Sequence, residues 1–332
     1  MIDIKLLEQL CLCNGISGDE GNVRNLIINE IKDCADDIKT DNLGNLIVFK
    51  KGKKSAKSKL MVSAHMDEVG LMVTDITSDG YLKFDEVGGI DRRVLPGKRV
   101  CVGRNGLNGV IGVKPIHLTN GDEKTAVPKM NDMYIDIGAE SRKDALKYVN
   151  YGDGINFEGD FKINGKTVVT KALDDRFGCY VLINLIKSEP EYDMYFTFVV
   201  QEEVGLRGAR PAAFTVNPDF ALVIESTTAA DVAEVDASHQ VCNLSKGATV
   251  TVMDRATVYD KEMISAAFEL AEKNNINVQY KRAVAGGNDS GAIHQSRGGV
   301  RTLAISLPSR YIHAPSTAAN LDDCESVLKL AK

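Results

Sequence analysis

A central stretch of the chain, residues 71–161, differs in pattern from the sequence on either side of it. Short runs of alternating apolar and polar residues are separated there by many glycines, and only one short helix is expected, at residues 141–148. This pattern is typical of a small all-β unit. Helices and strands precede the stretch, and strands alternate with helices after residue 167. That alternation predicts a mainly parallel or mixed sheet covered by helices.

The two patterns together predict an α/β fold in which a mixed sheet flanked by helices carries an inserted unit resembling a small β-barrel. One domain would comprise residues 1–70 and 162–332, split in sequence, and the second would comprise residues 71–161. A chain of 332 residues is long enough for two domains.

The elements expected outside the insertion are of ordinary length. Helices are expected over residues 6–34, broken at 15–18 and resuming at Asp19, and also at 175–187 and 262–274. Strands are expected at residues 46–49, 60–64, 194–200, 220–224 and 300–307.

Composition and charge exclude several classes of protein. The net charge of −6 excludes a general nucleic-acid binder, because no basic excess is available to displace phosphate counterions. The one basic run, residues 50–59, is explained as a solvated turn. No apolar stretch is long enough to span a bilayer, and the charged N-terminus does not resemble a signal peptide. Seven irregularly spaced cysteines predict no disulfide framework. We therefore expect a soluble, cytoplasmic protein without membrane or nucleic-acid partners.

Polar residues stand directly after several of the expected strands. The residues in question are His65, the pair Glu202-Glu203, Glu225 and, slightly further along, His313, while Asp174-Asp175 precedes a helix. In open α/β sheets, ligands bind beyond the carboxyl ends of the strands. The repetition of this feature at four strands favours one shared site.

Two histidines and several carboxylates form a ligand set that suits zinc, cobalt or manganese and lacks the thiolates of a structural zinc site. A carboxylate can bridge two such ions. His65 and Asp67 are two residues apart, so on an extended segment both side chains face the same way. Asp67 can then accept the second ring N–H of His65. Side chains of the adjacent Glu202 and Glu203 diverge, so one can bind metal while the other serves as a base.

Each of these residues also has an ordinary explanation when it is taken alone. A lone His65 would be a core histidine, Glu202-Glu203 a solvated strand end, and Asp174-Asp175 a helix cap. Their combination at strand ends favours the metal site. The other histidines, which have no comparable carboxylate partners and are interpreted as structural, are His117, His239 and His294.

At these residues the sequence resembles the tetrahedral (TET) aminopeptidases, a family of dinuclear metallopeptidases with a zinc-peptidase-like fold that includes glutamyl aminopeptidases. The shared segments follow the family's order and cover nearly the whole chain. They are Ala64–Gly70, Gly88-Gly89, Arg93–Gly97, Lys171–Arg176, Gln201–Gly205, Arg207–Ala209, Asp289–Ile293 and Tyr311–His313. Together these segments are highly specific, whereas any one alone would be weak.

The resemblance implies a role for each expected ligand. Asp174 would bridge two divalent ions, which would be zinc or cobalt, or else manganese. Glu203 and His313 would complete one site. His65 and Glu225 would complete the other. The family usually has aspartate at the position of Glu225, so the second site departs from the family pattern by one methylene.

The resemblance also implies roles beyond the ligands. Glu202 would be the general base, and Asp67 would orient the first histidine. The β-rich insertion would be a lid and dimerisation domain. Dimers would assemble into a hollow tetrahedral dodecamer that admits only short peptides as substrates.

Three other functions are compatible with parts of the sequence. A dinuclear carboxypeptidase or amide deacylase would use a similar centre, and Glu225 keeps that alternative open. A polysaccharide hydrolase would need two carboxylates about 5–10 Å apart and usually no metal. A shell that binds metal or peptide without catalysis would not require Glu202.

Overall fold

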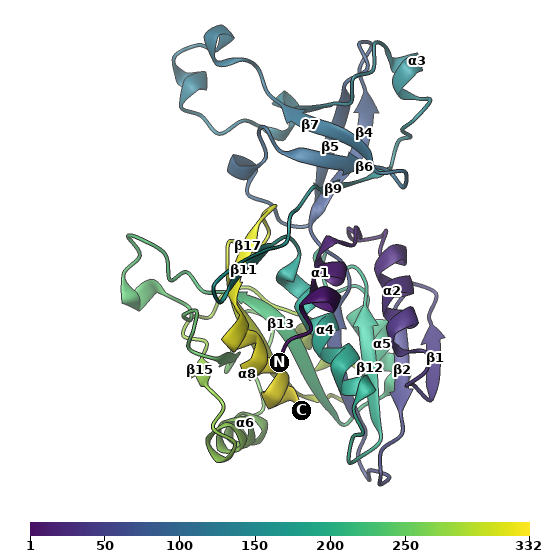
Figure 1. Cartoon of the computed structure of the whole chain (residues 1–332), viewed down its shortest axis with the longest axis vertical. Helices are drawn as coiled ribbons and strands as arrows, with labels where there is room; N and C mark the ends of the chain where they lie inside the picture. Colours follow the sequence, from purple (N-terminus) through teal and green to yellow (C-terminus); the bar gives the residue numbers. More distant parts are fainter.

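The computed structural model covers residues 1–332 and describes every side chain except that of Glu123. It contains a large α/β unit and a smaller β-barrel that stands above it (Figure 1). The chain passes into the barrel after β3 and returns to the sheet through β10 and β11. The predicted fold class is therefore confirmed.

An 11-stranded mixed sheet forms the α/β unit, with the order β1-β2-β12-β3-β13-β16-β17-β11-β10 and with β14 and β15 attached beside β16. Its strands are β1 (Asp37–Thr40), β2 (Leu46–Lys50), β3 (Leu60–His65), β10 (Lys162–Asn164), β11 (Thr167–Thr170), β12 (Met194–Val199), β13 (Phe220–Thr228), β14 (Ala248–Val250), β15 (Val278–Tyr280), β16 (Arg301–Arg310) and β17 (Thr317–Asn320). The four central strands, β12, β3, β13 and β16, run parallel, so their carboxyl ends lie at one edge.

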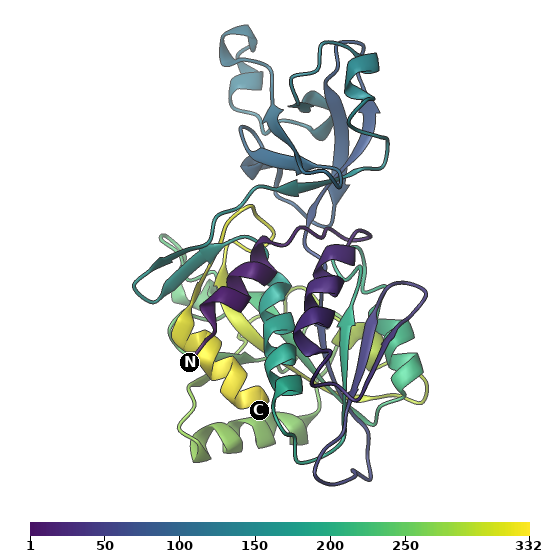
Figure 2. The ribbon, with the colours of Figure 1, turned by 45° about the vertical axis from the view of Figure 1, so that its right-hand side comes forward.

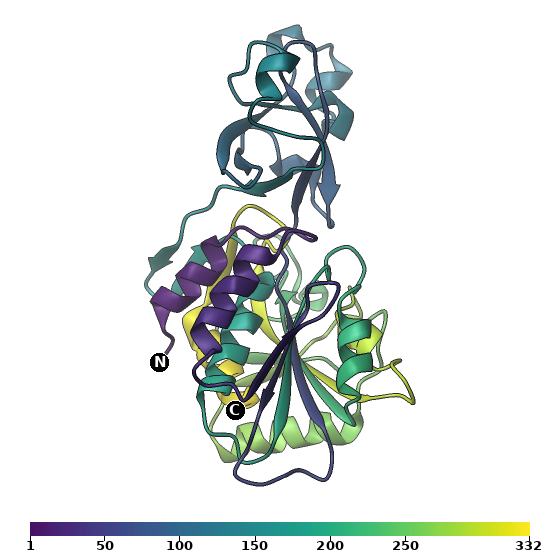
Figure 3. The ribbon, with the colours of Figure 1, turned by 90° about the vertical axis from the view of Figure 1, so that its right-hand side faces the viewer.

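Helices cover both faces of this sheet (Figure 3). The main apolar core lies under α1 (Ile4–Leu12), α2 (Gly21–Ile31), α4 (Leu173–Lys187), α6 (Lys261–Lys273) and α8 (Leu321–Ala331). A smaller core on the opposite face includes side chains of α5 (Ala209–Val216) and α7 (Ser290–Ile293). Because α4 lies between the sheet and α1, α2 and α8, it is apolar around most of its circumference.

The barrel closes in the order β4-β5-β8-β7-β6-β9 and has its own apolar core (Figure 2). Its strands are β4 (Gly70–Ile76), β5 (Leu82–Val87), β6 (Arg99–Val102), β7 (Leu107–Gly112), β8 (Tyr134–Asp136) and β9 (Gly154–Phe157), and the short helices of this region are η1 (Arg92–Val94), η2 (Ile116–Leu118), η3 (Asp122–Lys124), η4 (Met130–Asp132) and α3 (Arg142–Ala145). Closure leaves no open sheet edge in this small unit.

Several expected boundaries require correction. The strand expected at 220–224 continues to Thr228, because Ser226, Thr227 and Thr228 keep their pairing with β16. Glu225 therefore lies inside β13 rather than after it. The second N-terminal helix begins at Gly21, two residues later than expected, and β16 extends to Arg310. Among the described residues, no helix combines the length and apolar character needed to cross a membrane.

Candidate metal centre and active site

All seven side chains predicted to form the site come together at the carboxyl edge of the sheet. His65 is the last residue of β3, and Glu202 and Glu203 follow β12. His313 lies three residues after β16, and Asp174 stands in the non-helical first turn of α4. The parallel order β12-β3-β13-β16 explains why segments so distant in sequence meet at one place.

Asp174 lies between the two histidines. Its Oδ1 is 3.4 Å from Nε2 of His65, and its Oδ2 is 3.4 Å from Nε2 of His313. On the first side, Oε2 of Glu225 is 3.7 Å from Nε2 of His65. On the second side, Oε2 of Glu203 is 3.2 Å from Nε2 of His313. The carboxylate thus divides its two oxygens between two separate three-residue groups.

These groups fit divalent ions. Two ligand atoms bound at about 2.1 Å to a tetrahedral ion lie about 3.4 Å apart, which is close to the observed spacing. Asp174 Oδ1 and Glu225 Oε1 are buried without a hydrogen-bond partner among the described residues. A buried carboxylate oxygen without a donor is costly unless a cation binds it. The described residues offer a third possible group, made of His65, Glu202 and Glu203.

The cluster contains more carboxylates than histidines, and several of these groups are buried. Burial, followed by the charge of Asp174, raises the pKa of Glu203 to about 8. Burial also raises the pKa of Glu225 well above its usual range. For His313, burial opposes protonation, but the hydrogen bond with Asp174 and the charge of Glu203 outweigh it and raise the pKa to about 9. Cations in the cluster would let all three groups lose their protons.

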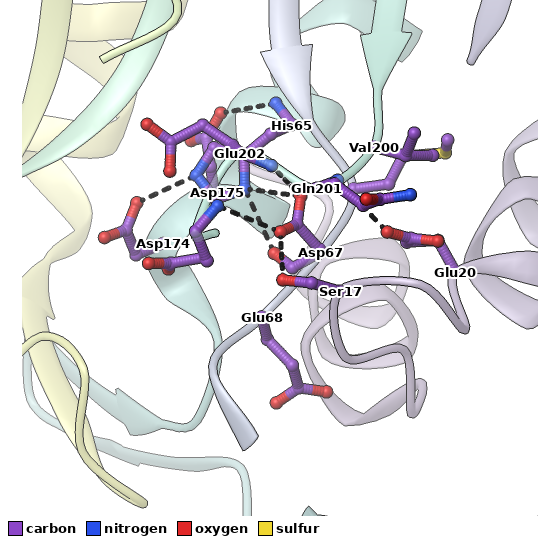
Figure 4. A network of polar contacts seen from close by, with 12 residues as sticks. Ser17, Glu20, His65, Asp67, Glu68, Asp174, Asp175, Val200, Gln201 and Glu202 are labelled. Atoms are coloured by element: carbon purple, nitrogen blue, oxygen red, sulfur yellow. Dashed lines mark hydrogen bonds and ion pairs between the residues drawn. The ribbon is translucent and has the colours of Figure 1, made fainter. Parts of the chain in front are cut away.

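Asp67 is completely buried and joins three parts of the site (Figure 4). Its Oδ1 accepts the backbone N–H of Glu202 at 3.0 Å, and its Oδ2 accepts that of Glu203 at 3.1 Å. Nδ1 of His65 lies 3.4 Å from Oδ1 and 3.1 Å from the backbone carbonyl oxygen of Asp67. The backbone oxygen is therefore the nearer acceptor for the ring N–H, and the carboxylate chiefly holds the Glu202-Glu203 turn.

Two residues of the loop between α1 and α2 belong to the site and were missed from the sequence. Ser17 donates its hydroxyl to Oδ2 of Asp67 at 2.6 Å. Oε1 of Glu20 accepts the N–H of Gly18 at 2.7 Å and that of Gln201 at 3.1 Å. The break at residues 15–18 was visible in the sequence, but a serine there is ordinarily a turn or cap residue.

A buried arginine links the end of α1 to the segment that contains His65 and Asp67. The guanidinium of Arg176 donates to the carbonyl oxygens of Leu10, Cys13 and Met66 at 2.6 to 2.7 Å. It thereby ties the end of α1 to the segment that follows His65. Asp175, the acidic residue next to Asp174, accepts the N–H of Gly178 at 3.0 Å.

A cavity of about 170 Å³ opens onto this cluster. Its walls include His65, Asp174, Glu202, Glu225 and His313, and they extend to residues 285–288. The other three histidines lie outside the groups that could hold an ion among the described residues. His117 and His239 are exposed, and Nδ1 of His294 contacts the carbonyl oxygen of Ser290 at 2.7 Å.

The sequence profile of the M42 glutamyl aminopeptidase family matches residues 44–330. The chain belongs to the M42 aminopeptidase family. It is therefore a peptide hydrolase, and membership of this metallopeptidase family implies that it binds divalent metal.

Relatives of this M42 aminopeptidase cover nearly its whole length. A protein of Acetivibrio thermocellus that carries an aminopeptidase name is 43% identical over 98% of this chain and 96% of its own. The lysyl aminopeptidase of Pyrococcus furiosus is 33% identical over 100% of this chain and 96% of its own.

Solved structures agree with this relationship. The TET1 peptidase of Pyrococcus horikoshii, which can assemble into a tetrahedron or a large octahedral shell, is 39% identical with a TM-score of 0.87, covering 99% of this chain and 97% of its own. A Thermotoga maritima structure described as an endoglucanase is also 39% identical, with a TM-score of 0.82 and coverage of 98% and 95%.

Proposed function

We propose that this M42 aminopeptidase removes single N-terminal residues from short peptides with two divalent ions bound at the carboxyl edge of its sheet. One ion would be held by His65, Asp174 and Glu225. The second would be held by Asp174, Glu203 and His313. The observation that carries the proposal is the division of the two Asp174 oxygens between the two histidines.

When bound, the ions supply Lewis acidity, which lowers the pKa of water and stabilises negative charge on an oxygen. The remaining steps belong to side chains. Glu202, which lines the cavity, takes a proton from the attacking water as the oxygen bonds to the scissile carbonyl carbon. It returns that proton to the leaving nitrogen as the C–N bond breaks. Glu225 offers its carboxylate to the free α-ammonium group of the substrate, which restricts cleavage to the N-terminal residue.

Asp67 and Ser17 would position these groups rather than act on substrate. The carboxylate of Asp67 accepts the backbone N–H groups of Glu202 and Glu203, and Ser17 donates its hydroxyl to the same carboxylate. Partners of this kind orient metal ligands and maintain their basicity. The donor set of imidazole and carboxylate supports zinc or cobalt, or manganese, over softer ions.

We further propose that residues 71–161 form a separate lid and dimerisation domain. Gly88 of this stretch has φ of +85°, and a Cβ at that position would lie 3.2 Å from Cβ of Glu203. The insertion therefore approaches the site closely enough to limit the size of substrates. We propose that the dimers assemble into a tetrahedral dodecamer, and the similarity to the TET1 peptidase supports this assembly. Seven free cysteines support a cytoplasmic location.

Cleavage assays after metal removal test the function. Purified protein would be treated with a chelator, dialysed, and assayed on aminoacyl p-nitroanilides and their N-acetylated forms after addition of Co²⁺, Zn²⁺ or Mn²⁺. The proposal predicts that metal restores cleavage of the free-amine substrates alone. Equal cleavage of the acetylated forms would indicate an amide deacylase instead, and activity that survives chelation would contradict metal dependence. Chelator-resistant glucan hydrolysis would favour the polysaccharide hydrolase.

A further inference from the structure

The loop between α1 and α2 lies at the junction of the two units, directly under the barrel (Figure 3). Its Ile16 is completely buried. A Cβ on Gly70 would lie 2.2 Å from Cγ2 of Ile16, and a Cβ on Gly154 would lie 3.0 Å from its Cδ1. These glycines begin the first and last strands of the barrel, β4 and β9, so Ile16 fills a space that they leave open. The preceding residue, Gly15, donates its N–H to Oδ1 of Asn156 in β9 at 3.1 Å. Two consecutive residues of the loop are therefore held by the barrel.

The same loop also holds residues 201–203, the turn that carries the proposed base. The three N–H groups of this turn all donate to buried carboxylates (Figure 4). The first donates to Oε1 of Glu20 at 3.1 Å, and the next two donate to Asp67 at 3.0 and 3.1 Å. Ser17 donates to Asp67 in turn. Gln201 has φ of +56°, a left-handed conformation that residues other than glycine adopt where their surroundings impose it. The path of the turn therefore depends on these acceptors.

The geometry of the loop connects these two sets of contacts. Ile16 forms a parallel β-bridge with Glu68, so the loop is extended at this point. Successive side chains of an extended segment point to opposite sides. Ile16 accordingly meets the barrel, and the next residue, Ser17, meets Asp67. The N–H of Glu68 donates to the carbonyl oxygen of Gly15 at 3.0 Å. The segment that leads from Asp67 into the barrel is therefore fixed against the same loop.

The barrel also approaches the turn directly at Gly88, but that contact is of a different kind. A Cβ on Gly88 would lie 3.2 Å from Cβ of Glu203, so the barrel packs there against one side chain of the turn. The contacts made through the loop at residues 15–20 instead end on backbone N–H groups. A change in how the barrel is seated should therefore reach the backbone of Glu202 through Ile16.

We propose that Ile16 is a positioning residue that makes the placement of Glu202 depend on the seating of the barrel. Its side chain, packed against Gly70 and Gly154, fixes the loop whose carboxylate contacts hold the turn. The inference rests on the proposed role of Glu202 as the base. It gives the insertion a role besides those of lid and dimerisation domain, because the barrel then completes the support of the active site. Displacement of a catalytic group by about 1 Å can lower the rate by about 10²-fold.

A clash and its relief test this coupling. Gly154→Ala adds a methyl group 3.0 Å from Cδ1 of Ile16, with its other contacts at 3.4 Å or more. In metal-loaded protein, kcat on a free-amine p-nitroanilide should fall by about 10-fold, with KM changed by less than about twofold. Ile16→Val removes Cδ1, so the double variant Gly154→Ala/Ile16→Val should recover most of the loss. Hydrogen–deuterium exchange at residues 201–203, measured on metal-free protein, should be faster in Gly154→Ala and return to the wild-type rate in the double variant.

Gly109→Ala is the matched control, because it places the same added methyl group elsewhere in the barrel. A Cβ there would lie 2.7 Å from Cγ2 of Ile135, which belongs to the barrel's own core. This variant should lower the melting temperature measured by calorimetry, because the core is overpacked. Both kcat and exchange at residues 201–203 should remain at the wild-type level.

Several outcomes would overturn the assignment. Wild-type kcat and exchange in Gly154→Ala would contradict it, and so would an equal loss in Gly109→Ala or a double variant that recovers nothing. If Gly154→Ala does not fold, Ile16→Ala, which needs no added space, should show the same loss of kcat and the same faster exchange. Wild-type behaviour of that variant would then refute the coupling. Failure of the wild type to cleave any free-amine substrate would refute the proposed function itself, whereas the exchange measurement would still report on Ile16.

Discussion

The two units of this molecule bury very different side chains. In the barrel, Asn156 is the only buried polar side chain among the described residues 70–157, and it accepts the N–H of Gly15 in the α/β unit. At the carboxyl edge of the α/β sheet, His65, Asp67 and Glu225 are all at most 4% exposed. Burial of polar groups opposes folding unless partners satisfy them. The interior of the barrel therefore serves packing, whereas the edge of the sheet buries polar side chains that could bind a metal ion.

The barrel also exposes large apolar side chains on its surface, where they do not contribute to its core. Ile116 is 71% exposed and Leu118 is 58% exposed, both in η2. The sheet edge instead concentrates charge in a cavity. Changes at the edge should therefore alter metal binding and catalysis, and matched changes in the barrel should not.

Removal of the bridging carboxylate should give the largest effect. Asp174→Ala removes a possible ligand from both groups at once. Activity and metal affinity should therefore fall by more than the roughly 10–100-fold that is typical when a residue hydrogen-bonded to a metal ligand is mutated. Metal analysis of the purified variant and its kcat/KM on a free-amine substrate would check this. Retention of one ion with normal turnover would show that the two groups do not share Asp174.

Neutralisation of the proposed base should separate catalysis from metal binding. Glu202→Gln keeps the shape of the side chain, so metal content should remain at the wild-type level while kcat falls by about 10²–10⁴-fold. The measurement is kcat on p-nitroanilides with metal content determined on the same sample. A parallel loss of metal would place Glu202 among the ligands, which its membership of the third group allows.

A matched pair of serine variants compares the two units directly. Ser17→Ala removes the 2.6 Å donor to Asp67 and should weaken metal binding by about 10–100-fold. Ser78→Ala, at an exposed turn of the barrel, removes a contact with Asp79 and should leave metal binding unchanged. Competition with a chromogenic chelator would measure both affinities. Equal behaviour of the two variants would refute a role for the loop at residues 15–18.

The pH dependence of metal binding should give a smaller, graded effect. Without metal, Glu203 with a pKa of about 8 and His313 with a pKa of about 9 hold protons at pH 7. Bound ligands must lose those protons, so apparent affinity should rise with pH up to about 9, by about tenfold per unit for each proton released. Isothermal titration in buffers of different ionisation enthalpy would show the release. Heats independent of buffer would contradict it.

Much of the site was predictable because its chemistry is written in residue types at strand ends. His65 and His313 stand out for that reason, and Asp174 stands out as one of two adjacent aspartates before a helix. Glu225 was identified although the strand before it was predicted to end too early. The polar residues Ser226–Thr228 resemble the end of a strand, but they remain paired with β16.

The missed residues carry no comparable signal. Ser17 is one serine in a helix break, and only the fold brings it to Asp67 across 50 residues of sequence. Arg176 was named only as part of a shared family segment, and its role was not predicted because the carbonyl groups around its buried guanidinium come from distant parts of the chain.

Counting the ions tests the central claim most directly. Metal-stripped protein would be titrated with Co²⁺ while bound metal and cleavage of a free-amine substrate are followed together. The account predicts two ions bound per chain in the wild type, activity that depends on them, and loss of this pattern in Asp174→Ala. Saturation of both binding and activity at one ion per chain, or an unchanged titration in the variant, would contradict a centre shared through Asp174.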